Sequence, residues 1–404
     1  MTTRPDIRFL DRHTPPHILT LVLLAGLSAL AMNVFLPSLP RMTAHFQTDY
    51  AVMQLSVSLY LACNAVLQVI IGPISDRFGR RPVLLGSILL FLLATIGTLF
   101  ATSIEMFLLF RMCQAVIVAA MVLSRAVVRD MVDEAEAASM IGYVTMGMAI
   151  VPMLGPMLGG VLDEVFGWEA NFLLLFVSGI LVLFLTWRDL GETATARPSS
   201  FGAQMREYPE LLTARRFWGY CLAAAFSSGS FFAFLGGAPF VGSQVFGLSP
   251  AVLGLYFGAP AVGYAFGNFL SGRLSTRFGV NRMVLWGTLI TLGGLLALML
   301  TYAWILQAAV VFFGFFVFVG IGNGMVLPNA TAGMLSVRPH LAGSASGLGG
   351  AIMIGGGAGV SALAGALLQP GSGPWPLLII MLVTAVAGVA SILYVIRREQ
   401  RLGR

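Results

Sequence analysis

The stretch Gly72-Pro-Ile-Ser-Asp-Arg-Phe-Gly-Arg-Arg81 organises this sequence, because a second copy of it stands 200 residues further along the chain. That copy is Gly272-Arg-Leu-Ser-Thr-Arg-Phe-Gly-Val-Asn281, and glycine, serine, arginine, phenylalanine and glycine hold the same places in both. The same offset pairs glycines elsewhere: Gly147 with Gly347, Gly155 with Gly355, and Gly159 with Gly359. Repetition at a constant offset indicates that the chain consists of two homologous halves.

Both copies lie between long apolar segments. Hydrophobic residues make up 58% of the chain and charged residues only 10%, whereas soluble domains carry about 25% charged residues. Twelve windows approach the roughly 20 apolar residues that a membrane-spanning helix needs. They are 18–40, 50–71, 83–101, 106–128, 138–162, 170–187, 217–241, 250–271, 283–302, 304–335, 342–368 and 375–396. The sequence therefore predicts an all-α membrane protein with twelve transmembrane helices in two pseudo-symmetric bundles of six.

One polar segment divides the two predicted bundles. Residues 191–215 contain Arg197-Pro198-Ser199-Ser200 and Glu207-Tyr208-Pro209-Glu210, a composition that interrupts helical periodicity. We expect an N-terminal bundle over 1–190, a cytoplasmic linker over 191–215 and a C-terminal bundle over 216–404.

The positive charges predict the orientation in the membrane. All 23 basic residues are arginines, and they fall mainly in alternate breaks between the apolar windows. Because cytoplasmic loops carry the excess of basic residues, both termini are expected in the cytoplasm. The same scattering argues against a nucleic-acid partner, in spite of the net charge of +6. The apolar run after Arg12 continues too far for a signal peptide, so we expect no cleavage there.

Several motifs resemble those of the major facilitator superfamily, and within it the Bcr/CflA-type drug efflux transporters. The 72–81 loop is similar to the signature between helices two and three, and 147–160 resembles the antiporter signature of helix five. Segments 35–40, 111–115 and 124–130 resemble those exporters' helices one and four. The resemblance covers essentially the whole chain. It implies the major facilitator fold, alternating access, and export of small molecules from a bacterial cell across its inner membrane.

The resemblance also assigns conformational roles. Gly72 and Gly79 suit close approach and a tight turn, while Asp76 is expected to contact the start of helix eleven near Gly343 and Ser344. Small residues and bends in helix five are expected to form the seam between the halves. The predicted gating residues are Gly72, Asp76, Arg77, Gly79, Arg80, Arg81, Gly147, Gly155, Pro156 and Gly159. Helix eleven, with Gly355 and Gly359, is expected to present the same surface.

The candidate substrate site starts from Arg111, because a charge within a span usually faces a cavity or a partner. Asn33 lies at similar depth, and Gln114 is one turn from Arg111. The alternative is that Arg111 donates to backbone carbonyls of helix one or two. Arg125 is interpreted either as an anchor or as part of the cavity mouth. Phe231 and Tyr256 are the predicted aromatic wall, although packing is the commoner role for such residues.

Asn33 departs from the pattern of the related exporters, which generally carry an acid there. After Glu210 the only acidic residue is Glu399, so we expect neutral or anionic cargo. Proton antiport is predicted for the exporter; an organic-anion uniporter or importer of the same fold is the alternative. No ATP-binding loop, enzyme constellation, cofactor motif or metal pattern occurs in the sequence. We expect a monomer in the lipid bilayer that binds a small-molecule substrate.

Overall fold

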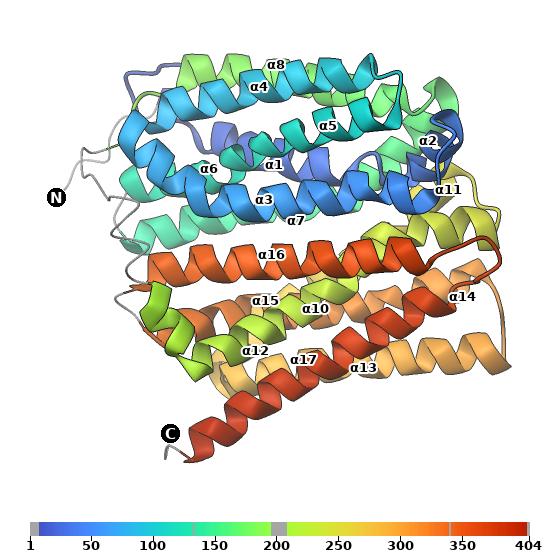
Figure 1. The fold of residues 1–404 in the computed structure, drawn as a ribbon. Helices are drawn as coiled ribbons and strands as arrows, with labels where there is room; N and C mark the ends of the chain where they lie inside the picture. The colour runs from blue at the N-terminus through green and yellow to red at the C-terminus, as the bar shows by residue number, and fades with distance from the viewer. Residues whose placement is uncertain (1–7, 132–133, 195–207, 339–340, 402–404) are drawn as a thin grey trace.

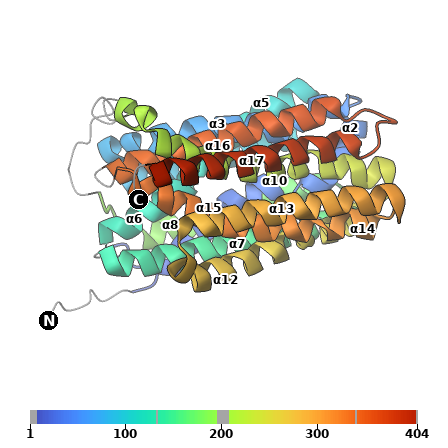
Figure 2. The ribbon, with the colours of Figure 1, turned by 90° about the horizontal axis from the view of Figure 1, so that it is seen from below.

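The computed structural model describes residues 8–131, 134–194, 208–338 and 341–401. These residues form a bundle of helices, with the first half of the chain above the second in Figure 1. We call the end at which α1 begins and α17 ends the terminal end, and the opposite end the far end. The view in Figure 2 shows the long helices running roughly parallel between these two ends.

The first half builds six spans, several of them from more than one helical piece. Their bounds are α1 Ile18–Asn33, η1 Leu36–Ser38, α2 Leu39–His45, α3 Tyr50–Phe78, α4 Arg80–Leu99, α5 Ile104–Gln114, η2 Ala115–Ile117, α6 Val118–Met131, α7 Glu134–Phe166 and α8 Glu169–Asp189. The first span turns to 3₁₀ geometry at Pro37 because proline cannot donate a backbone hydrogen bond.

The second half repeats this order. Its bounds are α10 Arg215–Phe240, η3 Val241–Val245, α11 Pro250–Tyr256, α12 Gly258–Phe278, α13 Val280–Trp304, α14 Ala309–Gly314, α15 Phe316–Ser336, α16 Ala342–Leu367 and α17 Trp375–Arg401. The break after Gln114 in the fourth span recurs after Gly314 in the tenth, at the same offset as the loop copies. The predicted start of the tenth span at 304 is too early, because α13 runs to Trp304 and α14 begins at Ala309.

Membrane-spanning character is found in nearly all of these segments. Among the described residues, ten helical segments are long and apolar enough to cross a bilayer. The two remaining predicted spans correspond to α7 and to the pair α11–α12. Large apolar side chains such as Leu93, Ile180 and Val383 are half exposed along the helices, as lipid-facing residues should be.

The two halves meet along two pairs of helices. In the first, α3 of the first half runs against α16 of the second; in the second, α7 packs against α11 and α12. The predicted linker ends in a short helix over 208–213, whose Tyr208 and Leu211 are buried with Phe217 in a cluster of the second half. The interface between the halves therefore lies along the middle of the molecule (Figure 1).

Candidate functional site

Arg111 lies enclosed inside the first half, with a side chain that is 1% exposed. Its Nη2 donates to the Ala31 carbonyl oxygen at 2.8 Å and its Nε to the Ser56 carbonyl oxygen at 3.3 Å. Its guanidinium carbon lies 4.3 Å from the centre of the Phe35 ring and 3.9 Å from that of Tyr60. Such contacts offset the cost of removing a cation from water. Arg111 thus joins α1, α3 and α5.

Gln114 is the third hydrogen-bond partner of this guanidinium. Its Oε1 accepts from Arg111 Nη1 at 2.8 Å, and its Nε2 donates to the Thr95 hydroxyl at 2.8 Å. The sequence places these two residues one turn apart on one helical face, and the structure shows a hydrogen bond between their side chains. The backbone partners of Arg111 are those of the alternative interpretation, so lining of a cavity by Arg111 stays a prediction for a different conformation.

Asn33 is fully buried at the end of α1. Its Nδ2 donates to the Ala29 carbonyl oxygen at 2.8 Å, while its Oδ1 has no hydrogen-bond partner among the described residues. A buried amide oxygen without a donor is costly. This oxygen is therefore a candidate acceptor for a donor on a ligand.

Arg125, in α6, lies at the interface between the halves. It is half-buried and lies near Tyr264, a residue of α12 in the second half. Arg129 lies near it. The sequence spacing predicts that Arg129 pairs with Asp133 one turn further on, and Asp133 falls outside the described residues. Of the two arginines predicted for the substrate site, Arg111 and Arg125, it is thus Arg125 that lies close to the other half.

Phe231 and Tyr256 belong to one aromatic cluster in the second half. The Phe231 ring centre lies 6.5 Å from that of Phe234, Phe234 lies 6.3 Å from Phe313, and Phe313 lies 4.8 Å from Tyr256. Both predicted residues are half-buried at the edge of this cluster. The structure shows no direct contact between them and the Arg111 group.

Arg80 centres a polar network at the terminal end of the first half. Its guanidinium contacts Asp76 Oδ1 at 2.6 Å and Asp130 Oδ2 at 3.0 Å, and it also donates to Ser75. The neighbouring Arg81 donates to the carbonyl oxygens that end α8. Asp76 is thus engaged by Arg80 here, and its contact with the start of helix eleven stays a prediction.

The three remaining loop residues differ in their surroundings. Gly79 has φ of 95°, a conformation that favours glycine. A Cβ at Gly72 would meet nothing within 4 Å, so no close approach is seen there. The Arg77 guanidinium lies 5.3 Å from the centre of the adjacent Phe78 ring. Of the two predicted glycines, only Gly79 has a backbone conformation that requires glycine.

Helix α7 approaches its neighbours closely at the far end, the part of the helix whose glycine surroundings the structure describes. A Cβ at Gly159 would overlap the carbonyl oxygen of Val34, just after α1, and one at Gly160 would overlap the Pro250 carbonyl oxygen of the second half. Conversely, a Cβ at Gly254 would overlap the carbonyl oxygen of Pro156. These backbone contacts form a tight seam between the halves. Gly155 is in ordinary contact with Leu30, and the surroundings of Gly147 lie outside the described part of the structure.

Hydrogen bonds between described residues join the halves at the same end. Tyr50 donates to the Gly236 carbonyl oxygen at 2.7 Å, Gln54 Nε2 donates to the Ser361 hydroxyl at 2.7 Å, and Glu164 Oε2 accepts from the Ala251 amide at 3.2 Å. The molecule is therefore closed at the far end. Sequence reasoning missed these residues, because a lone tyrosine or glutamine in a span carries no periodic signal.

Glu192 is a second residue that sequence reasoning missed. Its carboxylate accepts from the backbone amides of Arg80 at 2.8 Å and Arg81 at 3.2 Å, at the N-terminus of α4. Carboxylates are favoured there because the first amides of a helix have no partner within it. Among the described residues, no cluster of histidine, cysteine and acidic side chains that could hold a metal ion is found.

The chain matches the model of the Major Facilitator Superfamily over residues 21–360 and again over 243–404. It belongs to that superfamily of membrane transporters. The resemblance to Bcr/CflA-type drug efflux transporters is confirmed by its relatives.

A chloramphenicol resistance protein of Pseudomonas aeruginosa is 32% identical over 91% of this chain and 88% of its own length. Multidrug resistance protein D of Escherichia coli K12 is 29% identical over 90% of this chain and 92% of its own length. Among solved structures, a D-xylose-proton symporter aligns with a TM-score of 0.73 and 16% identity over 94% of this chain and 96% of its own. The structural likeness confirms the fold of twelve helices in two halves.

Proposed function

We propose that this protein exports small neutral or anionic, drug-like molecules across the bacterial inner membrane by alternating access. The relatives named for chloramphenicol and multidrug resistance, which align over about nine tenths of the chain, support export of such compounds. The arginine distribution supports an orientation with the terminal end in the cytoplasm. The far end, with its glycine seam, is then the outer gate.

The observation that carries the choice of cargo is the charge of the helical interior. Arg111 is buried in the first half and Arg125 lies at the interface between the halves. The acidic residues Asp76, Asp130 and Asp163 stand near the ends of their spans instead. Because the field in a low-dielectric interior is weakly screened, a cationic cargo is disfavoured and an anionic or neutral one is accepted.

The proposed substrate-binding residues are Asn33, Arg111, Gln114, Arg125, Phe231 and Tyr256. In this set the unpartnered Asn33 oxygen accepts a hydrogen bond and Arg125 attracts negative charge, while Phe231 and Tyr256 offer ring surface. Arg111 and Gln114 hold the end of α1 in place through Ala31. The set is divided between the two halves, as alternating access around a central site requires.

Proton antiport is the energy source that we propose. The presence of Asn33 where related exporters carry an acid favours a second candidate, an organic-anion uniporter or importer driven by the gradient of its own cargo. Both candidates share the fold and the positive interior. They differ in whether protons move when cargo moves.

Inside-out membrane vesicles with an imposed proton gradient separate the two candidates. A pH-sensitive dye reports proton loss on addition of chloramphenicol, of an anionic compound of similar size, or of a lipophilic cation. Native protein is expected to dissipate the gradient with the first two and not with the cation. Arg125→Gln should reduce the anionic response more than the neutral one, whereas Arg188→Gln, the same change at an exposed position, should alter neither.

Each other outcome has a defined meaning. Labelled cargo that crosses the membrane without any proton movement would favour the uniporter. A response to the cation alone would contradict the charge argument. If Asn33→Asp alone gains proton movement, the native chain is not a proton antiporter.

A further inference from the structure

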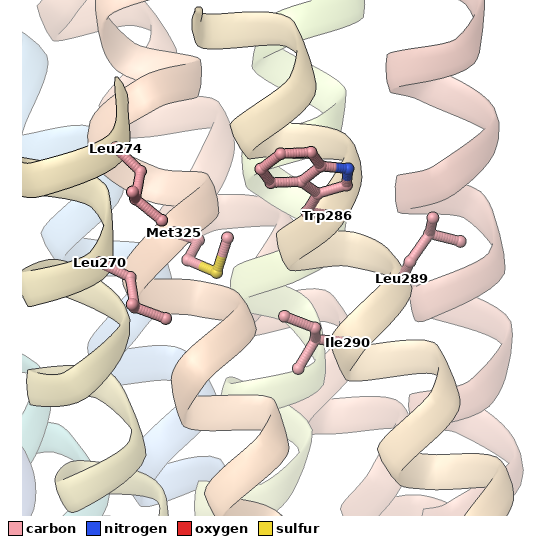
Figure 3. A pocket seen from close by; sticks show the side chains of 6 residues that line it. All are labelled: Leu270, Leu274, Trp286, Leu289, Ile290 and Met325. Atoms are coloured by element: carbon pink, nitrogen blue, oxygen red, sulfur yellow. The ribbon is translucent and has the colours of Figure 1, made fainter. Parts of the chain in front are cut away.

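An apolar cavity opens on the lipid-facing side of the second half. It has a volume of about 440 Å³ and lies between α12 and α13, with α15 behind them (Figure 3). Its lining residues are Leu270, Leu274, Trp286, Leu289, Ile290 and Met325. Trp286 and Leu289 are 37% and 44% exposed, so the cavity is reached from the side of the bundle and not from its core.

A second, polar cavity of about 680 Å³ lies at the terminal end of the same two helices. It is formed around the 276–282 loop, with Tyr220 and Glu399 on its other side. The Phe278 ring, which lines the polar cavity, lies 5.0 Å from the ring of Trp286, which lines the apolar one. The two cavities are therefore neighbours along one groove.

Helical spacing continues this groove from one cavity into the other. On α12, Leu270, Leu274 and Phe278 are four residues apart and share one face. On α13, Arg282 precedes Trp286 by four residues and lies on the face of Ile290. One continuous surface thus passes from apolar side chains in the membrane to an arginine at its edge.

The polar cavity carries positive charge that the fold leaves available. Arg277 and Arg282 are exposed, and no ion pair of either is found among the described residues. The carboxylate in the cavity, Glu399, is already held by Arg216 and Asn281. An anion in this cavity would therefore be attracted by two guanidinium groups, while the charge of Glu399 is already compensated by Arg216.

The first half shows what binds at the equivalent place. There the amides of Arg80 and Arg81 at the start of α4 hold the Glu192 carboxylate. The equivalent residues at the start of α13 are Val280 and Asn281, and no carboxylate is found on their amides in the described part of the chain. The copy of the loop in the second half thus has a helix start of the same kind, where unpaired amides favour an anion.

We propose that the two cavities together bind one anionic phospholipid of the leaflet at the terminal end. Its phosphate lies against Arg277, Arg282 and the start of α13, and one acyl chain lies in the apolar cavity beside Trp286. The first half lacks this site, since Pro82 and Gly86 stand where Arg282 and Trp286 stand in the second. A Cβ at Gly86 would meet nothing within 4 Å, and glycine offers no ring there to contact an acyl chain.

Native mass spectrometry of the detergent-purified full chain tests this site. Phosphatidylglycerol and phosphatidylcholine with the same acyl chains are added in turn, and the retained lipid is counted. One phosphatidylglycerol is expected to remain bound where phosphatidylcholine does not. Arg277→Gln and Arg282→Gln should each weaken retention about fivefold, the effect of one basic residue at an anionic lipid surface. Trp286→Ala should also weaken it by removing the acyl-chain contact.

The matched control is Arg77→Gln. Arg77 lies over Phe78 at the same 5.3 Å that separates Arg277 from Phe278, but in the half without the groove. It should leave retention unchanged. Equal retention of the two lipids, or an equal loss in Arg77→Gln and Arg277→Gln, would overturn the proposal.

A second measurement separates a lipid from a free phosphate. Thermal stability of the protein is recorded with phosphatidylglycerol, with glycerol 3-phosphate and with inorganic phosphate. The lipid alone is expected to raise the melting temperature, and Trp286→Ala should diminish that rise. If inorganic phosphate gives the same rise as the lipid, the cavity is an anion site only and the acyl-chain part of the proposal is wrong.

Discussion

The two halves repeat one order of helices, but the positions around Arg111 in the first half are polar and the equivalent positions in the second half are apolar. In the first half, Arg111 donates hydrogen bonds to Gln114 and to two backbone carbonyl oxygens. The equivalent positions of the second half are Val311 and Gly314, and the buried rings of the adjacent Phe312, Phe313 and Phe316 pack together there. One half is thus organised by directional hydrogen bonds and the other by apolar burial.

This difference shows how the two halves of a duplicated bundle can acquire different chemical character. Hydrogen bonds hold three helices of the first half in one arrangement, because a buried guanidinium left unpaired is costly. The aromatic cluster imposes no such directional requirement. The first half therefore supplies the charge that we propose to select cargo, and the second supplies ring surface.

The largest expected effect comes from removing the cation. Arg111→Leu leaves Gln114 and two carbonyl oxygens without their donor, so a loss of about 3–5 kcal/mol is expected. Arg111→Lys keeps the charge but not the forked geometry, so its loss of stability should lie between zero and that of Arg111→Leu. The equivalent change in the aromatic half, Val311→Leu, should cost less than about 1.5 kcal/mol. Thermal unfolding in detergent measures all three, and equal losses for Arg111→Leu and Val311→Leu would remove the contrast between the halves.

The next prediction compares α7 with its equivalent in the second half, α16. Gly159 and Gly359 occupy equivalent positions in these two helices. Gly159 is buried against the Val34 backbone, whereas Gly359 is exposed with nothing within 4 Å of a Cβ. Gly159→Ala should therefore cost about 3 kcal/mol through overpacking. Gly359→Ala should be neutral or stabilise the helix by up to about 1 kcal/mol. The same sign for both in thermal unfolding would show that the two helices pack alike.

The smallest effect concerns the two loop turns. Gly79 and Gly279 both have positive φ, at 95° and 81°. Either change to alanine should cost about 1–3 kcal/mol in backbone strain. A Cβ at Gly79 would in addition overlap Glu192, while one at Gly279 meets nothing within 4 Å.

Gly79→Ala should therefore cost about 1 kcal/mol more than Gly279→Ala, as expected for a displaced helix cap. In a Glu192→Ala background the difference should disappear. A difference that survives in that background would mean that the carboxylate is not its cause.

Much of the fold could be predicted because its signals are local and repeated. The loop copies at 72–81 and 272–281 and the apolar windows define two bundles of six helices. The spacing of Arg111 and Gln114 places them on one face of a single helical turn, where the structure shows their hydrogen bond. The start of span ten is predicted less well, because one apolar run covers spans nine and ten.

The packing of the glycines could not be predicted in this way. Gly159 and Gly359 hold the same register in the sequence, yet only Gly159 lies against a neighbouring backbone. Which side of a helix meets a neighbour depends on the relative rotation of packed helices, and a glycine carries no side chain to reveal it. The roles of Tyr50, Gln54 and Glu192 were missed for a related reason, since their partners are more than 100 residues away.

The sequence by itself determined the membrane class, the twelve spans, the duplication and the positive interior, because each follows from composition or from residues close together in the chain. Only the tertiary structure decided that Arg111 is bound to backbone carbonyls and that Arg125 faces the other half. It also decided that the closed seam is built on Gly160, Gly254 and Pro156. These depend on how the helices of the two halves dock, and docking is set by many weak contacts that no single stretch of sequence contains.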